Sequence, residues 1–279
     1  MFTRFLSSFL CFLFLGLFSS LSHAAPLKVR GAILMDFDRV KVIYRQNDNK
    51  KIPPASLTKI MTMYLVFDAI KAKKISLKTK VKVSRHAART GGSSMHLKAG
   101  DIVTVEQLLY GMAVASGNDA CVAIAEHLAG SEKKFIMLMN QKARKLEMRN
   151  TTFKTTNGLP ANGQFTTAND MLALSRNYIF KHPESLRYHS TKNYYYHRHK
   201  LKNNNPQLGK YKGADGLKTG WTIASGYNIV STGRRGKTRL IAVILGAGTA
   251  QIRAKELNRL MDAGYKLQKN KNRTVKSLL

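Results

Sequence analysis

The chain has 279 residues, with 47 lysine and arginine residues against 15 aspartate and glutamate residues, which gives a formal net charge of +32. Hydrophobic residues make up 44% of it, enough for a core, and this excludes a disordered polar tail. The two cysteines exclude a disulfide-rich scaffold and a zinc site built from cysteines. So large a positive charge indicates a polyanionic partner, either nucleic acid, an anionic lipid surface or another anionic polymer.

Residues 1–24 are typical of a secretory signal peptide. Arg4 supplies the positive start, residues 5–21 are almost wholly apolar, and Ser22-His23-Ala24 places small residues where a signal peptidase reads them. We expect cleavage after Ala24; the alternative is an uncleaved membrane anchor, because the apolar run approaches the length of a membrane span. We therefore expect a protein exported to the periplasm or associated with the cell wall.

Two apolar, β-branched runs open the remaining chain. They cover 32–36 and 40–45, and the short turn between them predicts a β-hairpin. Pro53-Pro54 then interrupts the chain, and a strongly apolar helix begins at Ser56. Because its apolar residues occupy several faces, we expect this helix to be buried. A polar stretch follows over 71–101.

The middle of the chain is predicted to be helical. Thr104 and Gln107 form a capping-box pattern for a helix that ends near Gly111. Three more helices are expected over 119–128, after Ser131 and over 168–180. The first of these places Cys121 within an apolar stretch, which predicts a buried and inert thiol.

Strands return towards the C-terminus, over 216–221, 227–232 and 238–245, before a closing helix over 252–266. Strands at both ends with helices between them predict one sheet assembled from the two ends of the chain. We expect a single domain over 25–266, followed by a basic C-terminal tail over 267–279 that shows no sustained apolar face.

The first motif with chemical meaning is Ser56-Leu57-Thr58-Lys59. Helix positions three apart share a face, so the lysine amine can approach the serine hydroxyl. A lysine kept neutral can take the proton of a serine nucleophile, and burial or a neighbouring cation lowers a lysine pKa. Taken alone, the motif also fits a helix N-cap followed by a surface lysine.

Two further tripeptides are each ambiguous alone. Ser-Gly-Asn at 116–118 offers a hydroxyl and an amide, but it also fits a turn with Asn118 or Asp119 as the next N-cap. Lys-Thr-Gly at 218–220 suits a strand that pairs with a peptide and attracts a carboxylate, or a basic strand with a bulge glycine.

The three motifs in this order resemble the signature of penicillin-binding proteins and class A β-lactamases. Their surroundings at 53–62, 116–120 and 215–220, with 157–159 and 224–228, are similar to the low-molecular-mass D-alanyl-D-alanine carboxypeptidases. The resemblance implies an α+β fold of the serine β-lactamase/transpeptidase type, with an antiparallel sheet flanked by helices, an all-helical subdomain and a cleft between them. It implies a serine-type D-Ala-D-Ala carboxypeptidase that acts on peptidoglycan stem peptides through an acyl-serine intermediate, with β-lactam antibiotics as covalent inhibitors.

The resemblance also implies a catalytic set: Ser56, Lys59, Ser116, Asn118 and Lys218. In this set Ser56 attacks the carbonyl between two D-alanines and Lys59 is its general base. Ser116 and Lys218 relay a proton to the leaving amine, while Asn118 orients the acyl side chain.

The implied substrate-binding residues are Thr219, Gly220, Trp221 and Arg253. The backbone N–H groups of Ser56 and Trp221 would form the oxyanion hole. Thr219 would bind the terminal carboxylate with Arg253 nearby, although Arg253 also fits a surface arginine on the closing helix.

No metal and no organic cofactor is expected. The histidines lack ligand spacing, and we expect His197 and His199 to alternate on an exposed strand. Export and the lack of a zinc-finger spacing or a Gly-rich phosphate loop argue against nucleic acid. We therefore expect the charge to bind the anionic cell wall or an anionic membrane surface.

Other activities stay open. Many carboxypeptidases of this family carry a second, β-rich domain and a C-terminal membrane helix, and we expect neither after the closing helix here. A single-domain chain resembles instead the smaller relatives that act as D,D-endopeptidases on cross-links. Trp221 stands where relatives often have histidine, which leaves the substrate preference open. A β-lactamase is less favoured, because 116–118 lacks the Ser-Asp-Asn pattern and Glu147 and Asn150 have the wrong spacing for a deacylating pair. A non-catalytic wall-binding protein is less favoured, because every polar member of the three motifs is present.

Overall fold

The structure is a computed structural model that describes residues 25–268 and 273–279. The predicted signal peptide therefore lies outside the described residues, as do residues 269–272 of the basic tail. In the described ranges, no helix combines the length and the apolar character that crossing a membrane requires.

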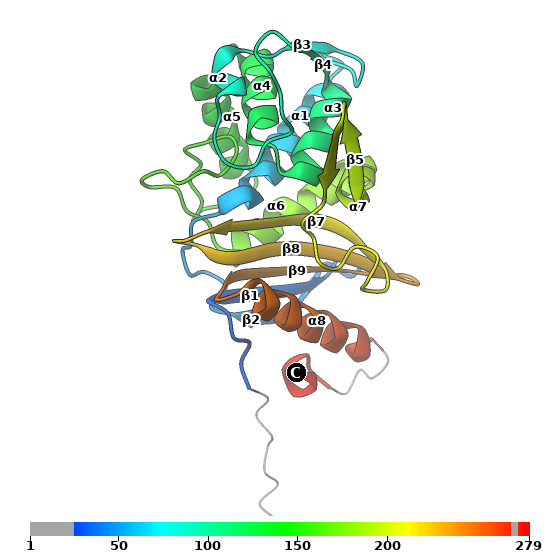
Figure 1. The fold of residues 1–279 in the computed structure, drawn as a ribbon. Coiled ribbons are helices and arrows are strands. Elements are labelled where there is room, and N and C mark those ends of the chain that lie inside the picture. Colours follow the sequence, from blue (N-terminus) through cyan, green and yellow to red (C-terminus); the bar gives the residue numbers. More distant parts are fainter. Residues whose placement is uncertain (1–24, 269–272) are drawn as a thin grey trace, which may run out of the picture.

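A five-stranded antiparallel sheet runs through the molecule in the order β2-β1-β9-β8-β7 (Figure 1). Its strands are β1 (Gly31–Asp36), β2 (Lys41–Gln46), β7 (Ala214–Thr222), β8 (Gly226–Arg235) and β9 (Thr238–Ala247). The N-terminal hairpin joins the late strands through the β1–β9 pair, so the prediction of one sheet built from both chain ends is confirmed. Both faces of the sheet are covered, and β9 is accordingly an unbroken apolar run from Leu240 to Ala247, all of it buried.

One face of the sheet is covered by α8 (Ala250–Leu267), the predicted closing helix, with a 3-10 turn over Lys276–Leu278 beyond it (Figure 1). Leu34 and Leu240 from the sheet and Leu257 from α8 share a small core there. Part of the predicted basic tail packs into this layer, where Val275 is fully buried.

The opposite face carries the helical half of the protein (Figure 1). It contains a 3-10 turn (Ala55–Thr58), α1 (Lys59–Lys71), α3 (Val105–Tyr110), a π-helical turn (Gly111–Ala115), α4 (Asn118–Ala129), α5 (Glu132–Lys145) and α6 (Ala168–Lys181). The larger core fills this half, and α1 is buried along most of its length, as predicted. The Thr104–Gln107 capping box is confirmed, and the side chains of Ser131 and Thr167 cap the helices that follow them.

Several short elements lie in stretches without a predicted structure. In the polar stretch, β3 (Lys80–Lys82) pairs with β4 (Ile102–Thr104), and α2 (Arg85–Ala88) lies between them. A 3-10 turn (Pro183–Ser185) and α7 (Leu186–Ser190) precede a hairpin of β5 (Asn193–Tyr196) and β6 (His199–Lys202). The expected alternation of His197 and His199 on one strand is wrong, because His197 adopts φ 48° in the turn of this hairpin.

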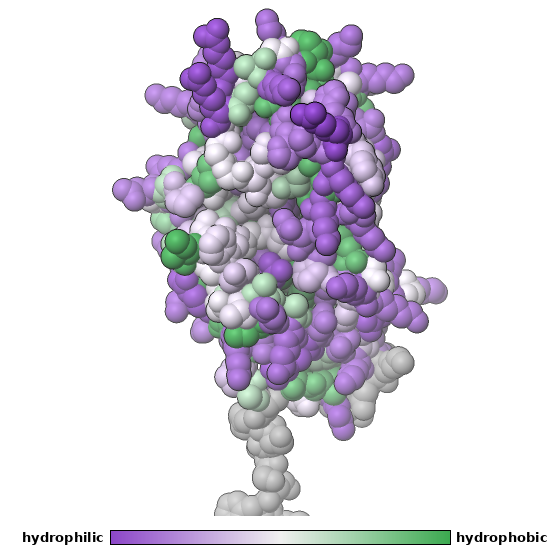
Figure 2. Space-filling model, viewed as in Figure 1, coloured by the Kyte–Doolittle hydropathy of each residue, from purple (hydrophilic) through white to green (hydrophobic). Residues whose placement is uncertain are grey.

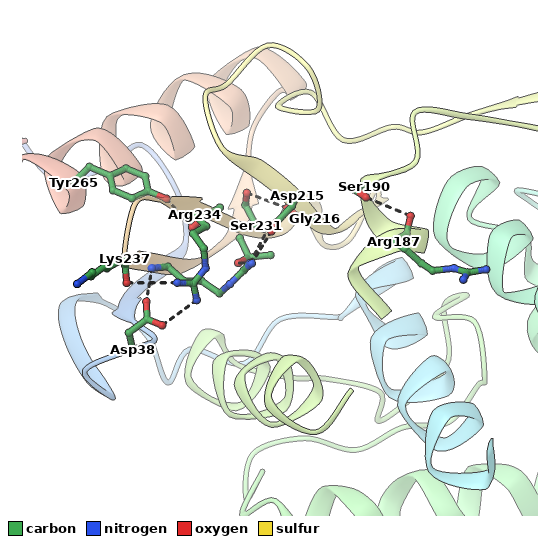
Figure 3. Close-up of polar contacts among 12 residues, drawn as sticks. Asp38, Arg187, Ser190, Asp215, Gly216, Ser231, Arg234, Lys237 and Tyr265 are labelled. Carbon is green, nitrogen blue, oxygen red and sulfur yellow. Dashed lines mark hydrogen bonds and ion pairs between the residues drawn. The ribbon is translucent and has the colours of Figure 1, made fainter. Parts of the chain in front are cut away.

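Ion pairs tie the strands together at one end of the sheet (Figure 3). Arg234 of β8 donates a 2.9 Å hydrogen bond to Asp38 in the turn between β1 and β2. Arg239 of β9 donates two parallel hydrogen bonds, of 2.9 and 2.7 Å, to the carboxylate of Asp215 on β7. The Arg239–Asp215 pair spans β8 and links β7, the edge strand that carries the third motif, to the centre of the sheet, while the Arg234–Asp38 pair links β8 to the N-terminal hairpin.

Candidate active site

Ser56 and Lys59 meet at the junction of the 3-10 turn and α1. Lys59 Nζ lies 3.0 Å from Ser56 Oγ, which is the contact that the helical spacing predicts. The turn begins with Ala55 at φ 48°, against the backbone of Gly158; a Cβ on Gly158 would lie 1.8 Å from the Ala55 carbonyl oxygen. A side chain at Gly158 would therefore displace the turn that presents the serine.

Lys59 is fully buried beneath the serine. Its amine also donates hydrogen bonds to Asn118 Oδ1 and to the Asn157 carbonyl oxygen, both at 2.7 Å. Burial lowers the pKa of Lys59 from 10.5 to about 8, and nearby Cys121 and Asp119 oppose part of this shift. About a tenth of such amines are neutral at pH 7, so Lys59 can accept a proton from Ser56.

Lys218 brings a second buried amine to the site from strand β7. Its Nζ donates a 3.0 Å hydrogen bond to the Thr219 carbonyl oxygen. Burial is the main cause that lowers the pKa of Lys218 to about 7, and the positive charge of Lys59 lowers it further. The site therefore holds two lysines that give up their protons far more readily than ordinary lysines.

The Ser-Gly-Asn motif lies where the π-helical turn meets α4. Ser116 adopts φ 60°, and Asn118 donates 2.7 Å hydrogen bonds from its backbone to the Ser93 carbonyl oxygen and from its side chain to that of Gly91. Asp119 does not cap α4. Its carboxylate accepts hydrogen bonds from the backbone N–H groups of Met95 and Leu97 and from the Ser94 hydroxyl, which fixes the 91–97 loop beside the site.

Gly220 lets strand β7 approach the serine closely. A Cβ at this position would lie 2.9 Å from the backbone nitrogen of Ser56 and 3.2 Å from that of Leu57. Trp221 follows and pairs with Tyr227 of β8, while its side chain remains 54% exposed. The two predicted oxyanion-hole residues thus belong to segments in direct contact.

These segments enclose a cavity of about 360 Å³. It is lined by Ser56, Ser93, Ser116, Asn204, Thr219, Gly220, Trp221, Tyr227 and Arg253. The predicted residues Lys59, Asn118 and Lys218 are buried next to it. A larger cavity of about 700 Å³ lies at the other end of the sheet, near Arg235 and Tyr265, and contains no motif residue.

Arg253 lies on the first turn of α8 and is not a surface residue. It is only 8% exposed, and its guanidinium group lies 5.9 Å from the centre of the Tyr227 ring. Burial lowers its pKa, and its Nε has no hydrogen-bond partner within residues 25–268 and 273–279. A buried cation with a free donor beside a cavity is suited to bind a carboxylate.

Ser93, Asn157, Asn204 and Tyr227 also contribute to the site. No motif marks Ser93 or Asn204, because each reaches the cavity through tertiary contacts from a loop. Asn157 and Tyr227 lie in segments similar to the carboxypeptidases, but without a predicted role.

The last residue types to place are cysteine and the other side chains that can bind a metal. Cys121 is buried under the site, so the predicted burial of this thiol is confirmed, and burial raises its pKa to about 12. Among the described residues, no three His, Cys, Asp or Glu side chains cluster as a metal site would require.

Comparisons with known proteins agree with this geometry. Residues 20–249 match the family model described as D-alanyl-D-alanine carboxypeptidase. The chain is 44% identical over 267 residues to the D-alanyl-D-alanine carboxypeptidase DacC of Escherichia coli, covering 91% of this chain and 67% of the relative. It is 38% identical over 252 residues to DacF of Bacillus subtilis, covering 88% of this chain and 64% of the relative. The chain thus spans about two thirds of the length of these curated relatives.

Solved structures show the same fold. Penicillin-binding protein 6B from Escherichia coli superposes with a TM-score of 0.82 at 38% identity, over 85% of this chain and 77% of that one. Penicillin-binding protein D2 from Listeria monocytogenes, in its ampicillin-bound form, superposes with a TM-score of 0.79 at 33% identity, over 86% of this chain and 98% of that one. The predicted fold, a sheet with flanking helices and a helical half, is confirmed, and the chain belongs to the D-alanyl-D-alanine carboxypeptidase family.

Proposed function

We propose that this protein is a serine-type D-Ala-D-Ala carboxypeptidase that removes the terminal D-alanine from peptidoglycan stem peptides. The observation that carries the proposal is the 3.0 Å contact between Ser56 Oγ and the amine of buried Lys59, beside the 360 Å³ cavity. A serine becomes a nucleophile when such a base takes its proton.

In the proposed acylation step, Ser56 Oγ bonds to the carbonyl carbon between the two D-alanines while Lys59 takes the hydroxyl proton. The carbonyl oxygen acquires negative charge, which the backbone N–H groups of Ser56 and Trp221 stabilise. When this intermediate collapses, the C–N bond breaks and the amine of the terminal D-alanine receives a proton by way of Ser116 and Lys218.

In the deacylation step, water attacks the ester carbonyl, and Ser56 leaves as the hydroxyl while the shortened peptide leaves as the acid. Thr219 and Arg253 would hold the terminal carboxylate during acylation, and Asn118 would orient the acyl side chain. The unpartnered Nε of buried Arg253 supports this assignment within the described residues.

β-Lactam antibiotics are the proposed covalent inhibitors. The similar protein D2 from Listeria monocytogenes has been solved with ampicillin and with cefotaxime bound. A β-lactam would acylate Ser56 as the substrate does, and the absence of a Ser-Asp-Asn motif favours slow release over β-lactamase turnover.

The proposed location is the periplasm or the cell wall, reached by export with residues 1–24 as the signal peptide. The net charge of +32 supports electrostatic association with the anionic wall or with an anionic membrane surface. Hydrophilic side chains cover most of the face shown in Figure 2, as such a surface contact requires. Binding to wall fragments should weaken steeply as the salt concentration rises, and an affinity that does not depend on the salt concentration would contradict this assignment.

The experiment that tests the catalytic proposal is mass spectrometry of the protein after incubation with penicillin and, separately, with a pentapeptide stem fragment. We expect a covalent adduct on Ser56 and loss of one alanine from the pentapeptide, and neither in Ser56→Ala. A folded wild-type protein that forms no adduct and leaves the pentapeptide intact would favour a non-catalytic wall-binding protein.

A further inference from the structure

A second cavity, of about 380 Å³, adjoins the proposed active site. Its lining includes three exposed lysines, Lys192, Lys202 and Lys210, with several asparagines. None of its lining residues is acidic, and none of the three lysines forms an ion pair within the described residues. Three uncompensated cations around one hollow attract anionic groups.

Asn204 lines both this cavity and the active-site cavity, so the two hollows share a wall. The loop that carries Asn204 is tied down on both sides. Asn203 donates hydrogen bonds to the His189 and Thr191 carbonyl oxygens, and Asn205 donates a 3.1 Å hydrogen bond to the carbonyl oxygen of Gly216.

The same loop also fixes the position of a lysine. The backbone N–H of Asn203 donates a 2.8 Å hydrogen bond to the Lys192 carbonyl oxygen, and the Lys192 side chain lies against Gly209, where a Cβ would be 2.1 Å from its Nζ. The chain reaches this loop from the β5–β6 hairpin and continues into β7 (Figure 1). The lysine cavity is therefore lined by a loop that is held in place beside β7.

The position along β7 tells which part of a substrate faces this cavity. Gly220 contacts the backbone of Ser56, so the reacting carbonyl lies at that point of the strand. Thr219, the proposed carboxylate contact, comes one residue earlier. Gly216 marks the position of the lysine cavity, because its carbonyl oxygen accepts hydrogen bonds from Asn205 of the cavity wall and from Ser231 (Figure 3). It comes four residues before Gly220, or about 13 Å at an ordinary strand rise. The lysine cavity thus lies beyond the carboxylate contact, on the leaving-group side.

We infer that this lysine cavity binds carboxylates on the leaving part of a D,D-cross-linked wall peptide. The inference rests on the proposed function and deepens it, because it names the side chains of this protein that would select a cross-linked substrate, the alternative that the sequence leaves open. A single D-alanine adds only about 3.5 Å of chain and ends at Thr219. In a cross-linked peptide, the leaving part is a second stem, which is long enough to pass Asn204 and carries further carboxylates.

The chemistry at Ser56 is the same for both substrates. The bond that breaks in the cross-link is again an amide on the D-alanine carbonyl, and the proton again goes to the leaving amine. The lysines touch only the departing strand, so they change which substrate is bound and leave the reacting atoms alone.

The test compares how tightly three peptides bind to the Ser56→Ala protein, which cannot cleave them. Three peptides share one acyl part: a pentapeptide monomer, a D,D-cross-linked dimer, and the same dimer with the carboxylates of the leaving strand amidated except the one beside the scissile bond. Titration calorimetry measures each Kd with the three cavity lysines intact and with Lys192→Gln and Lys202→Gln combined. The matched control combines Lys133→Gln and Lys134→Gln, two exposed lysines on α5.

We expect the preference for the dimer over the monomer to fall roughly tenfold in the cavity variant, because two charge contacts of ordinary strength are lost. The amidated dimer should bind the protein with intact cavity lysines about as weakly as the unmodified dimer binds the cavity variant. High salt should reduce the difference in Kd between the two dimers. Equal affinity for the two dimers, or an equal loss in the α5 control, would overturn the subsite.

Penicillin acylation of the wild-type protein separates this inference from the proposed function. If Ser56 forms no adduct, the catalytic proposal fails, while the calorimetric comparison still decides whether the lysines bind the leaving strand. If the adduct forms and the dimer gains nothing from its carboxylates, the catalytic proposal stands and the subsite does not exist.

Discussion

Lys59 should make the stability of this protein depend on pH in a way that a single substitution removes. The folded state holds the pKa of Lys59 at about 8, against 10.5 as the ordinary value. A lysine with a lowered pKa binds fewer protons in the folded than in the unfolded chain, so stability rises with pH between the two values. Integrated between pH 7 and pH 9.5, the Lys59 contribution to the free energy of unfolding rises by about 2 kcal/mol.

Urea unfolding at these two pH values measures the effect for the wild type and for Lys59→Met, with the exposed Lys133→Met as the control. The wild type should gain at least about 2 kcal/mol more than Lys59→Met between pH 7 and 9.5. Loss of the Lys59 charge also relieves its effect on the pKa of Lys218, which adds to the difference in the same direction. An equal gain in all three proteins would show that Lys59 keeps an ordinary pKa when folded, and the proposed general base would lose its physical basis.

Three further predictions concern positions around the site and the sheet. Gly220→Ala should slow penicillin acylation by about 100-fold or more in stopped-flow assays with circular dichroism unchanged, because its Cβ would lie 2.9 Å from the Ser56 nitrogen and shift this proposed oxyanion donor; an unchanged rate would refute the close approach. Cys121 should resist a thiol reagent in the folded protein and react only on unfolding, because its thiol is buried and its pKa is raised to about 12; rapid labelling without unfolding would contradict this. Arg239→Gln should lower the free energy of unfolding by about 1–3 kcal/mol through loss of the paired hydrogen bonds to Asp215, and a double-mutant cycle with Asp215→Asn that shows no coupling would disprove it.

The sequence predicted those parts of the site that depend on local spacing. Ser56 and Lys59 meet because residues three apart share a face at the start of a helix, and that contact is confirmed. The capping patterns at Thr104, Ser131 and Thr167 are also confirmed, because they involve only neighbouring residues.

Tertiary contacts account for what could not be predicted. Asp119 was compatible with an N-cap, but its carboxylate binds backbone groups more than twenty residues earlier in the chain. Asn204 lies in an asparagine-rich loop whose place beside β7 depends on the Asn205–Gly216 hydrogen bond. The burial of Arg253 likewise depends on how α8 packs on the sheet, and no pattern within the helix distinguishes it from an exposed arginine.

The sheet order has a consequence for how this chain can fold. Val243 of the central strand β9 pairs with Ile33 of β1, so the N-terminal hairpin has its main partner only after the intervening residues 47–237 have been made. Contacts between residues so far apart in sequence slow folding, because the intervening chain must be ordered before they form. The five-stranded sheet therefore cannot be completed before β9 is available to pair with β1. Under the proposed export, such a chain would still be unfolded when it passes through a translocation channel, and its active site would form only on the far side.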